Sequence, residues 1–170
     1  MTHPQYLLRP VNPAFIALTF VLAFLFNLLP WGDILWVPDM VALVLVFWNI
    51  HQPRKVGMGV AFVLGLLMDV HDARLLGEHA MAYTLLAYFA ITIHRRVLWF
   101  SVYTQALHVL PLLFIAHAVP VVIRLLMGAP LPGWPLLVAP GIEALLWPLA
   151  TGLLLAPQRR SIDVDETRPI

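Results

Sequence analysis

The chain has 170 residues, of which 61% are hydrophobic and only 11% are charged, whereas soluble domains are roughly 45–50% apolar and about 25% charged. This composition excludes a soluble domain, and most of the chain is expected to lie in the lipid bilayer. The formal net charge of +1 gives no basic field for nucleic acid, and the absence of Cys excludes disulfides and thiolate metal ligands.

The first apolar segment runs from Pro13 to about Leu29 and is expected to be a retained membrane helix. Asn12 before Pro13 is typical of a helix start, because the Asn side chain accepts a hydrogen bond from a free N–H and Pro lacks the N–H that would be unpaired there. No small-residue cleavage site follows the segment, so it is interpreted as a first span and not as a signal peptide.

The second span, from about Ile34 to Ile50, has roughly 17 residues, the lower limit for crossing a hydrocarbon core of about 30 Å. Pro38 and Asp39 lie near its start, and two arrangements remain open. Pro38 can occupy the first helical turn, with Asp39 accepting hydrogen bonds from free N–H groups. Alternatively, Pro38 interrupts the span and leaves Asp39 on an unwound segment.

The third span follows Arg54 and Lys55 and ends at an acid, Asp69. Three small residues four apart line one face of it: Gly57, Ala61 and Gly65. Small residues at this spacing allow a neighbouring helix to approach closely in lipid. Asp69 continues the same face four residues after Gly65, so its carboxylate is expected to point into the protein interior or a cavity.

The last three spans differ in length. The fourth, about Ala80 to Ile93, is short, and the loop before it is expected to add a helical turn from Leu75. The next segment, Val97 to Met127, would be roughly 46 Å long as a straight helix, which indicates one crossing bent at Pro111 and Pro120. The sixth span is expected from about Pro140 to Leu155, with Glu143 in its first turn and a kink at Pro148.

The cations orient these segments. Eight fall on one side of the membrane and two on the other: Arg9, Arg54, Lys55, Arg95, Arg96, Arg159, Arg160 and Arg168 against Arg74 and Arg124. Cytoplasmic loops carry the excess of Lys and Arg. The sequence therefore predicts an all-α integral membrane protein with about six transmembrane helices and both termini in the cytoplasm. Residues 1–158 form the membrane domain, and residues 159–170 are expected to be a disordered cytoplasmic tail.

Three acids fall near the extracytoplasmic ends of their helices: Asp39, Asp69 and Glu143. A charged residue in a membrane helix costs up to roughly 2.5–3.5 kcal/mol, so such residues face protein or water. Their shared depth predicts a cluster with Arg124 as the internal counter-charge. For Glu143 the alternative is a first-turn acid that interacts only with the helix dipole.

Catalytic and metal-binding patterns are missing. His71, Asp72 and His79 match no established ligand spacing, and His108 and His117 are expected to form hydrogen bonds between helices. The chain has no Gly-x-Ser-x-Gly, His-Glu-x-x-His or phosphate-loop motif. We therefore expect neither an enzyme nor a bound cofactor or metal.

The order VPDMVALVLVFW … GMGVAFVLGLLMDV, the short basic loops and Arg95-Arg96 after the fourth span resemble the bacterial rod shape-determining protein MreD family. The resemblance implies a non-catalytic, multi-pass scaffold of the cell inner membrane, within the rod complex (elongasome) that supports peptidoglycan synthesis. It implies MreC as partner, and through MreC the MreB filament, RodA and a class B penicillin-binding transpeptidase. It also implies a fold similar to the substrate-binding components of energy-coupling-factor transporters.

On this interpretation Asp39 and Asp69 serve packing or partner contact, and the small-residue face of the third span receives a partner's transmembrane helix. The alternative is a small-molecule-binding subunit of a vitamin-type transporter, with the acids lining an extracytoplasmic cavity. Few other polar groups accompany the acids, which favours the scaffold. A proton-coupled transporter is disfavoured because no inverted repeat is detectable.

Overall fold

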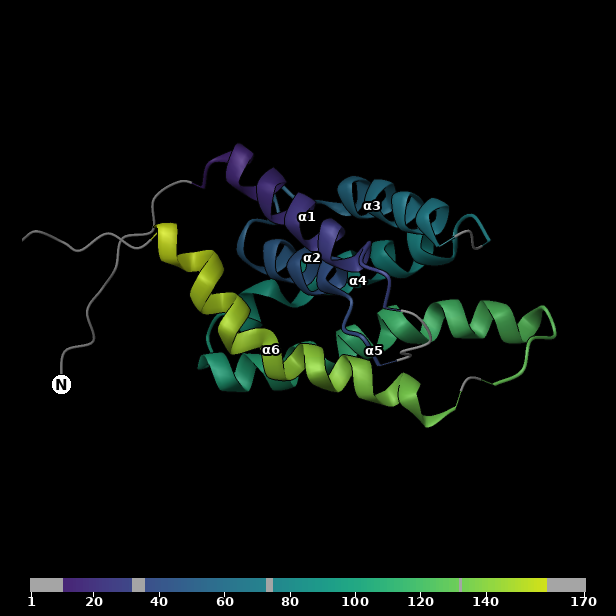
Figure 1. Ribbon diagram of the computed structural model, residues 1–170. Coiled ribbons are helices and arrows are strands. Elements are labelled where there is room, and N and C mark those ends of the chain that lie inside the picture. Colours follow the sequence, from purple (N-terminus) through teal and green to yellow (C-terminus); the bar gives the residue numbers. More distant parts are fainter. Residues whose placement is uncertain (1–10, 32–35, 73–74, 132, 159–170) are drawn as a thin grey trace, which may run out of the picture.

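In the computed structural model, which describes residues 11–31, 36–72, 75–131 and 133–158, all regular structure is helical. Six α-helices form three layers of two (Figure 1): α1 (Pro13–Asn27) with α3 (Met58–His71), α2 (Met40–His51) with α4 (Glu78–Val97), and α5 (Val102–Leu126) with α6 (Val138–Leu155). Short 3-10 turns, Trp134–Leu137 and Ala156–Gln158, flank α6. The prediction of an all-α fold is confirmed.

The middle layer forms the core, and α2 is its most enclosed helix. Every residue from Val41 to Ile50 is buried except Val44, as expected for a helix that is apolar on all sides. At 12 residues, α2 is about 18 Å long, shorter than the predicted span. It begins at Met40 because Asp39 caps it in an extended conformation. Pro38 lies before the cap and residues 36–38 are not helical, so the arrangement with Pro38 in the first turn is wrong. The alternative, an interrupted span with Asp39 outside the helix, agrees with the described residues.

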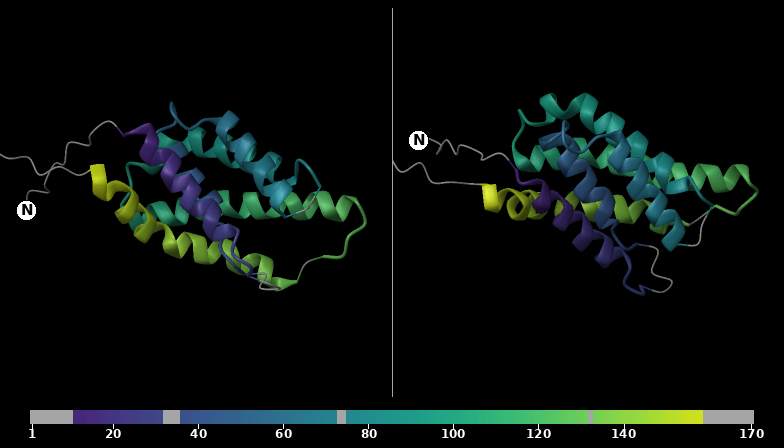
Figure 2. Two further views of the ribbon diagram at one scale, coloured as in Figure 1. Left: turned by 45° about the horizontal axis from the view of Figure 1, so that its top comes forward. Right: turned by 90° about the horizontal axis from the view of Figure 1, so that it is seen from above.

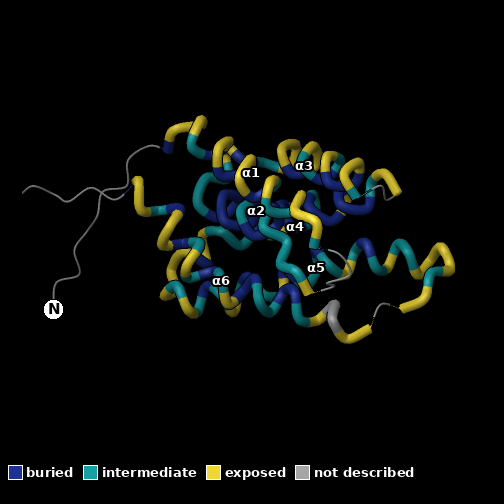
Figure 3. The backbone as a smooth tube through the Cα atoms, in the orientation of Figure 1, coloured by how far each residue is buried: buried dark blue, intermediate teal, exposed yellow. Residues whose placement is uncertain are grey.

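The outer helices present apolar faces to the surroundings. Figure 3 shows exposed residues along the outer sides of α1, α3 and α6, while α2 is mainly buried. Leu145, Leu149 and Leu153 of α6 are each at least 60% exposed, and an apolar surface of this extent is typical of contact with lipid. Within the described ranges, two helical segments are long and apolar enough to cross a membrane, Val102–Leu126 and Val138–Gln158.

The remaining helices depart from the predicted bounds at their ends. The fourth helix begins at Glu78 and ends at Val97. The loop before it therefore adds less than the predicted helical turn before Ala80, and the helix continues beyond its predicted end at Ile93. The fifth is a single helix, as predicted, with Pro111 and Pro120 inside it, but it begins at Val102 and not at Val97; the bend at these prolines stays a prediction. Figure 2 shows α5 and α6 side by side in opposite directions. The tail after Gln158 lies outside the described residues.

Helices α3 and α4 approach each other closely at Gly65. A Cβ atom on Gly65 would lie 2.3 Å from the Cα of Ala80, so only glycine fits at this position. Ala61 is completely buried, whereas a Cβ atom on Gly57 would meet nothing within 4 Å. At Gly65 the predicted small-residue face therefore packs against α4 of the same chain. The expectation that a partner's helix occupies this position is wrong.

Candidate functional site

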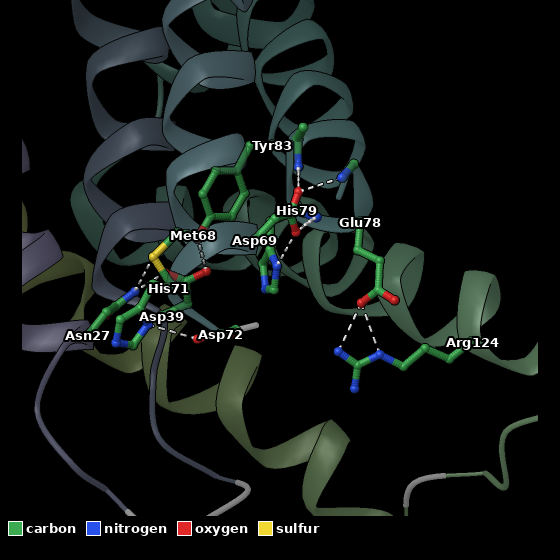
Figure 4. A network of polar contacts seen from close by, with 12 residues as sticks. Asn27, Asp39, Met68, Asp69, His71, Asp72, Glu78, His79, Tyr83 and Arg124 are labelled. Atoms are coloured by element: carbon green, nitrogen blue, oxygen red, sulfur yellow. Dashed lines mark hydrogen bonds and ion pairs between the residues drawn. The ribbon is translucent and has the colours of Figure 1, made fainter. Parts of the chain in front are cut away.

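Asp39 is the centre of a partly buried set of polar contacts at the end of the bundle where α2 begins (Figure 4). Its Oδ1 accepts hydrogen bonds from the Asn27 side-chain amide at 2.7 Å and from the Ala42 N–H at 3.0 Å. Its Oδ2 accepts the Tyr83 hydroxyl at 2.5 Å. The Asn27 Oδ1 in turn accepts the Met40 N–H at 3.1 Å. Asp39 thus joins α1, α2 and α4 and caps the central helix.

Glu143 extends these contacts to the third layer. Its side chain is completely buried, and its Oε1 accepts the Asp39 N–H at 2.7 Å. The same oxygen lies 2.7 Å from the His117 Nε2, with which it forms a hydrogen bond. The Oε2 has no hydrogen-bond partner among the described residues. Since α6 begins at Val138, Glu143 lies beyond the first turn, and the first-turn interpretation of this acid is wrong.

We call Asn27, Asp39, Tyr83, His117 and Glu143 the acid network. Its members come, in that order, from α1, the N-cap of α2, α4, α5 and α6. Hydrogen bonds between membrane helices each contribute about 0.6–2 kcal/mol, so the network holds three layers in one register. The predicted interhelical bond of His117 is confirmed. That of His108 is wrong, because its Nδ1 bonds to the Thr104 carbonyl within α5.

Asp69, near the C-terminal end of α3, caps the N-terminus of α4. Its carboxylate accepts the backbone N–H groups of Gly77 at 2.8 Å, His79 at 2.8 Å and Ala80 at 3.3 Å. It also bonds to the His79 ring Nδ1 at 2.9 Å. The N-cap residue Gly77 has no side chain to serve these groups, and its φ of 109° favours glycine. Asp69 therefore supplies the cap that α4 lacks in its own sequence.

Arg124 pairs with a different acid from the three predicted. Its Nε and one terminal nitrogen both donate to the Glu78 Oε2 at 2.9 Å (Figure 4). This ion pair joins α5 to the first residue of α4. The prediction that Arg124 is the counter-charge of Asp39, Asp69 and Glu143 is wrong for the described residues. The three acids instead form two groups, and the His79 ring, 5.8 Å from the Tyr83 ring, lies between them.

Histidines near this end do not assemble into a metal centre. His71 Nδ1 lies 2.9 Å from the Asp72 carboxylate, and His79 bonds to Asp69. Among the described residues, no group of three or more His, Asp or Glu side chains could hold a metal ion.

The sequence interpretation missed Asn27 and Tyr83. Asn27 carried a usable signal, because it is the one amide in an apolar first helix and polar groups in such helices face protein. Tyr83 carried none, since tyrosine is also common at membrane interfaces.

The geometry shows how many of the oxygens of Asp39, Asp69 and Glu143 are available to a ligand. Both oxygens of Asp39 and both of Asp69 accept hydrogen bonds from this chain. Of the carboxylate oxygens of Asp39, Asp69 and Glu143, the Glu143 Oε2 is the one without a hydrogen-bond partner among the described residues. A small-molecule site needs several convergent free polar groups, whereas these groups are turned toward one another. The arrangement ties helices together and offers little to a ligand.

Comparison with known proteins gives two findings. The family model described as rod shape-determining protein MreD matches residues 9–155. A curated relative from Haemophilus influenzae, "Rod shape-determining protein MreD", is 29% identical over 145 residues, which cover 84% of this chain and 89% of the relative. No solved structure matches.

Proposed function

Because the chain belongs to the MreD family of rod shape-determining proteins, we propose that it acts as a non-catalytic membrane scaffold of the rod complex. In this role it binds the single transmembrane helix of MreC, and through MreC it is connected to MreB, RodA and a class B penicillin-binding transpeptidase. The complex maintains cell shape by directing peptidoglycan synthesis. The protein is multi-pass and lies in the bacterial inner membrane, with lipid around its outer helices.

The proposed topology has six membrane-embedded helices and both termini in the cytoplasm. Four described cations support it: Arg54 and Lys55 precede α3, and Arg95 and Arg96 lie in the last turn of α4. Since α3 and α4 form an antiparallel pair, all four lie at one end of the bundle, which we call the basic end. An excess of Lys and Arg is typical of the cytoplasmic side. The short α2 fits this topology because non-helical backbone is tolerated where protein surrounds it.

The observation that carries the scaffold proposal is the internal pairing of the acids. Asp39 and Asp69 are the residues that a vitamin-type binding subunit would need in its cavity, and their oxygens accept hydrogen bonds from α1, α2 and α4. In a scaffold these acids fix the helix arrangement, while Glu143 and Arg124 fasten α6 and α5 to it. The partner contact then falls on the apolar outer faces and not on the acids.

Affinity co-purification from detergent-solubilised membranes tests this proposal. We expect the tagged wild-type protein to recover a single-span MreC-like protein in near-stoichiometric amount. Leu149→Arg tests whether α6 forms part of the contact with the partner. Leu149 faces outward, and an Arg side chain is costly on a face that contacts lipid or a partner helix. A matched variant at Leu22 of α1, 58% exposed against 60% for Leu149, probes the opposite layer.

The variant that loses the partner while keeping its expression level identifies the contact face. Recovery of no protein partner from wild type, together with a small molecule released on denaturation, would contradict the scaffold and favour the binding subunit.

A further inference from the structure

The described part of the chain contains an apolar pocket at the basic end, remote from the acid network. It has a volume of about 480 Å³ and is lined by four residues of α1 between Pro13 and Phe20, and by Lys55, Val56 and Val60. Ile16, Phe20 and Val56 are buried and form its floor. Ala17 and Val60 are exposed, so the pocket opens between α1 and α3 onto the surface that faces lipid.

The described charges at the mouth of this pocket are positive. Among the described lining residues, Lys55 is the only charged one, and its ammonium group donates to the Val11 carbonyl just before α1. Arg54 is adjacent and exposed. The described acids Asp39, Asp69, Asp72 and Glu78 lie at the other end of the bundle, where α2 and α4 begin (Figure 4), and Glu143 is hydrogen-bonded to Asp39. Within the described residues, a ligand at the mouth therefore meets cations without a competing carboxylate.

We propose that this pocket binds one anionic phospholipid, with an acyl chain on the apolar floor and the headgroup phosphate at Lys55 and Arg54. A helix with side chains is about 10–12 Å wide and would need a groove along its length, whereas the α1 wall spans only Pro13 to Phe20, about two turns. The volume is in the range of about 300–1,000 Å³ that small ligands occupy. The inference does not depend on the proposed scaffold function.

Native mass spectrometry of the full-length, detergent-purified protein tests the proposal. The protein is mixed with equal amounts of phosphatidylglycerol and phosphatidylcholine of identical acyl chains, and the retained lipids are counted. We expect wild type to retain one phosphatidylglycerol with roughly tenfold preference over phosphatidylcholine. Lys55→Gln is expected to lower the preference about fivefold, since each cation near a membrane surface contributes about that factor.

Ala17→Trp is expected to abolish retention of both lipids, because the indole fills the pocket from an exposed position of α1. Val60→Trp fills it from the opposite wall and gives the same result if Ala17→Trp does not fold. Leu18→Trp, at a position 52% exposed outside the pocket, and Arg96→Gln, in the last turn of α4, are the matched controls and should behave as wild type. Equal retention of the two lipids by wild type, or unchanged retention in both pocket-filling variants, would overturn the proposal.

Discussion

Gly65→Leu is expected to prevent stable folding of the chain. Any Cβ atom at this position would lie 2.3 Å from the Ala80 Cα, 2.5 Å from the Ala80 N and 2.6 Å from the His79 carbonyl carbon. These are backbone atoms, which cannot rotate aside, so α4 would have to move away from α3. That movement also breaks the hydrogen bonds of the Asp69 carboxylate to the same backbone. We expect a loss of roughly 3 kcal/mol or more, at the upper end of overpacking effects.

The yield of monodisperse protein in detergent, followed by thermal unfolding, measures this effect. Gly59→Leu is the matched control, because Gly59 lies on the same helix and a Cβ atom there meets nothing within 4 Å. Gly65→Ala should already be destabilised, since one methyl group is enough to clash. If Gly65→Leu had the yield and melting temperature of Gly59→Leu, the close approach of α3 and α4 would be wrong.

Asp39→Ala is expected to cost roughly 2–4 kcal/mol of the free energy of unfolding. The substitution removes the acceptor of the Asn27 amide, the Tyr83 hydroxyl and the Ala42 N–H, and a buried polar group without a partner costs about 1–3 kcal/mol. Tyr83→Phe removes only one donor and should cost about 1 kcal/mol. Because the two side chains share a hydrogen bond, the double variant should be less destabilised than the sum of the single variants by about 1–2 kcal/mol.

Unfolding of the purified protein by sodium dodecyl sulfate in mixed micelles gives the four free energies of this cycle. Tyr88→Phe is the control, since Tyr88 lies on the same helix and is 52% exposed. It should change stability little and show no coupling to Asp39. Additive effects of Asp39→Ala and Tyr83→Phe would mean that the contact between them contributes nothing to the fold.

Local features of the fold could be read from the sequence. The first helix begins at Pro13 with the Asn12 side chain accepting the Ala14 N–H at 3.0 Å, because capping depends only on neighbouring residues. The four-residue spacing from Gly65 to Asp69 correctly places both on one buried face. The segment after Ser101 forms one helix, since its length leaves no room for two crossings.

Contacts between helices could not be predicted in this way. A similar depth in the membrane predicts that Arg124 lies near several acids. Which acid it pairs with, Glu78, depends on how α4 and α5 are rotated about their axes. The same holds for Asp39, whose partners come from three other helices. The sequence left two arrangements open at Pro38, because apolar composition alone does not fix the residue at which a helix begins.

The central claim is that the acids hold the bundle together and that the folded bundle, not acid chemistry, supports rod shape. Asp39→Asn tests it most directly. Asn retains the Oδ1 acceptor for Asn27 and Ala42, and its amide can donate to the Tyr83 oxygen, but it carries no charge and cannot exchange a proton. The measurement is the cell shape of a rod-shaped bacterium that is depleted of its own copy and expresses the variant. We predict that Asp39→Asn, at wild-type abundance, restores rods as wild type does; round cells at that abundance would contradict the account.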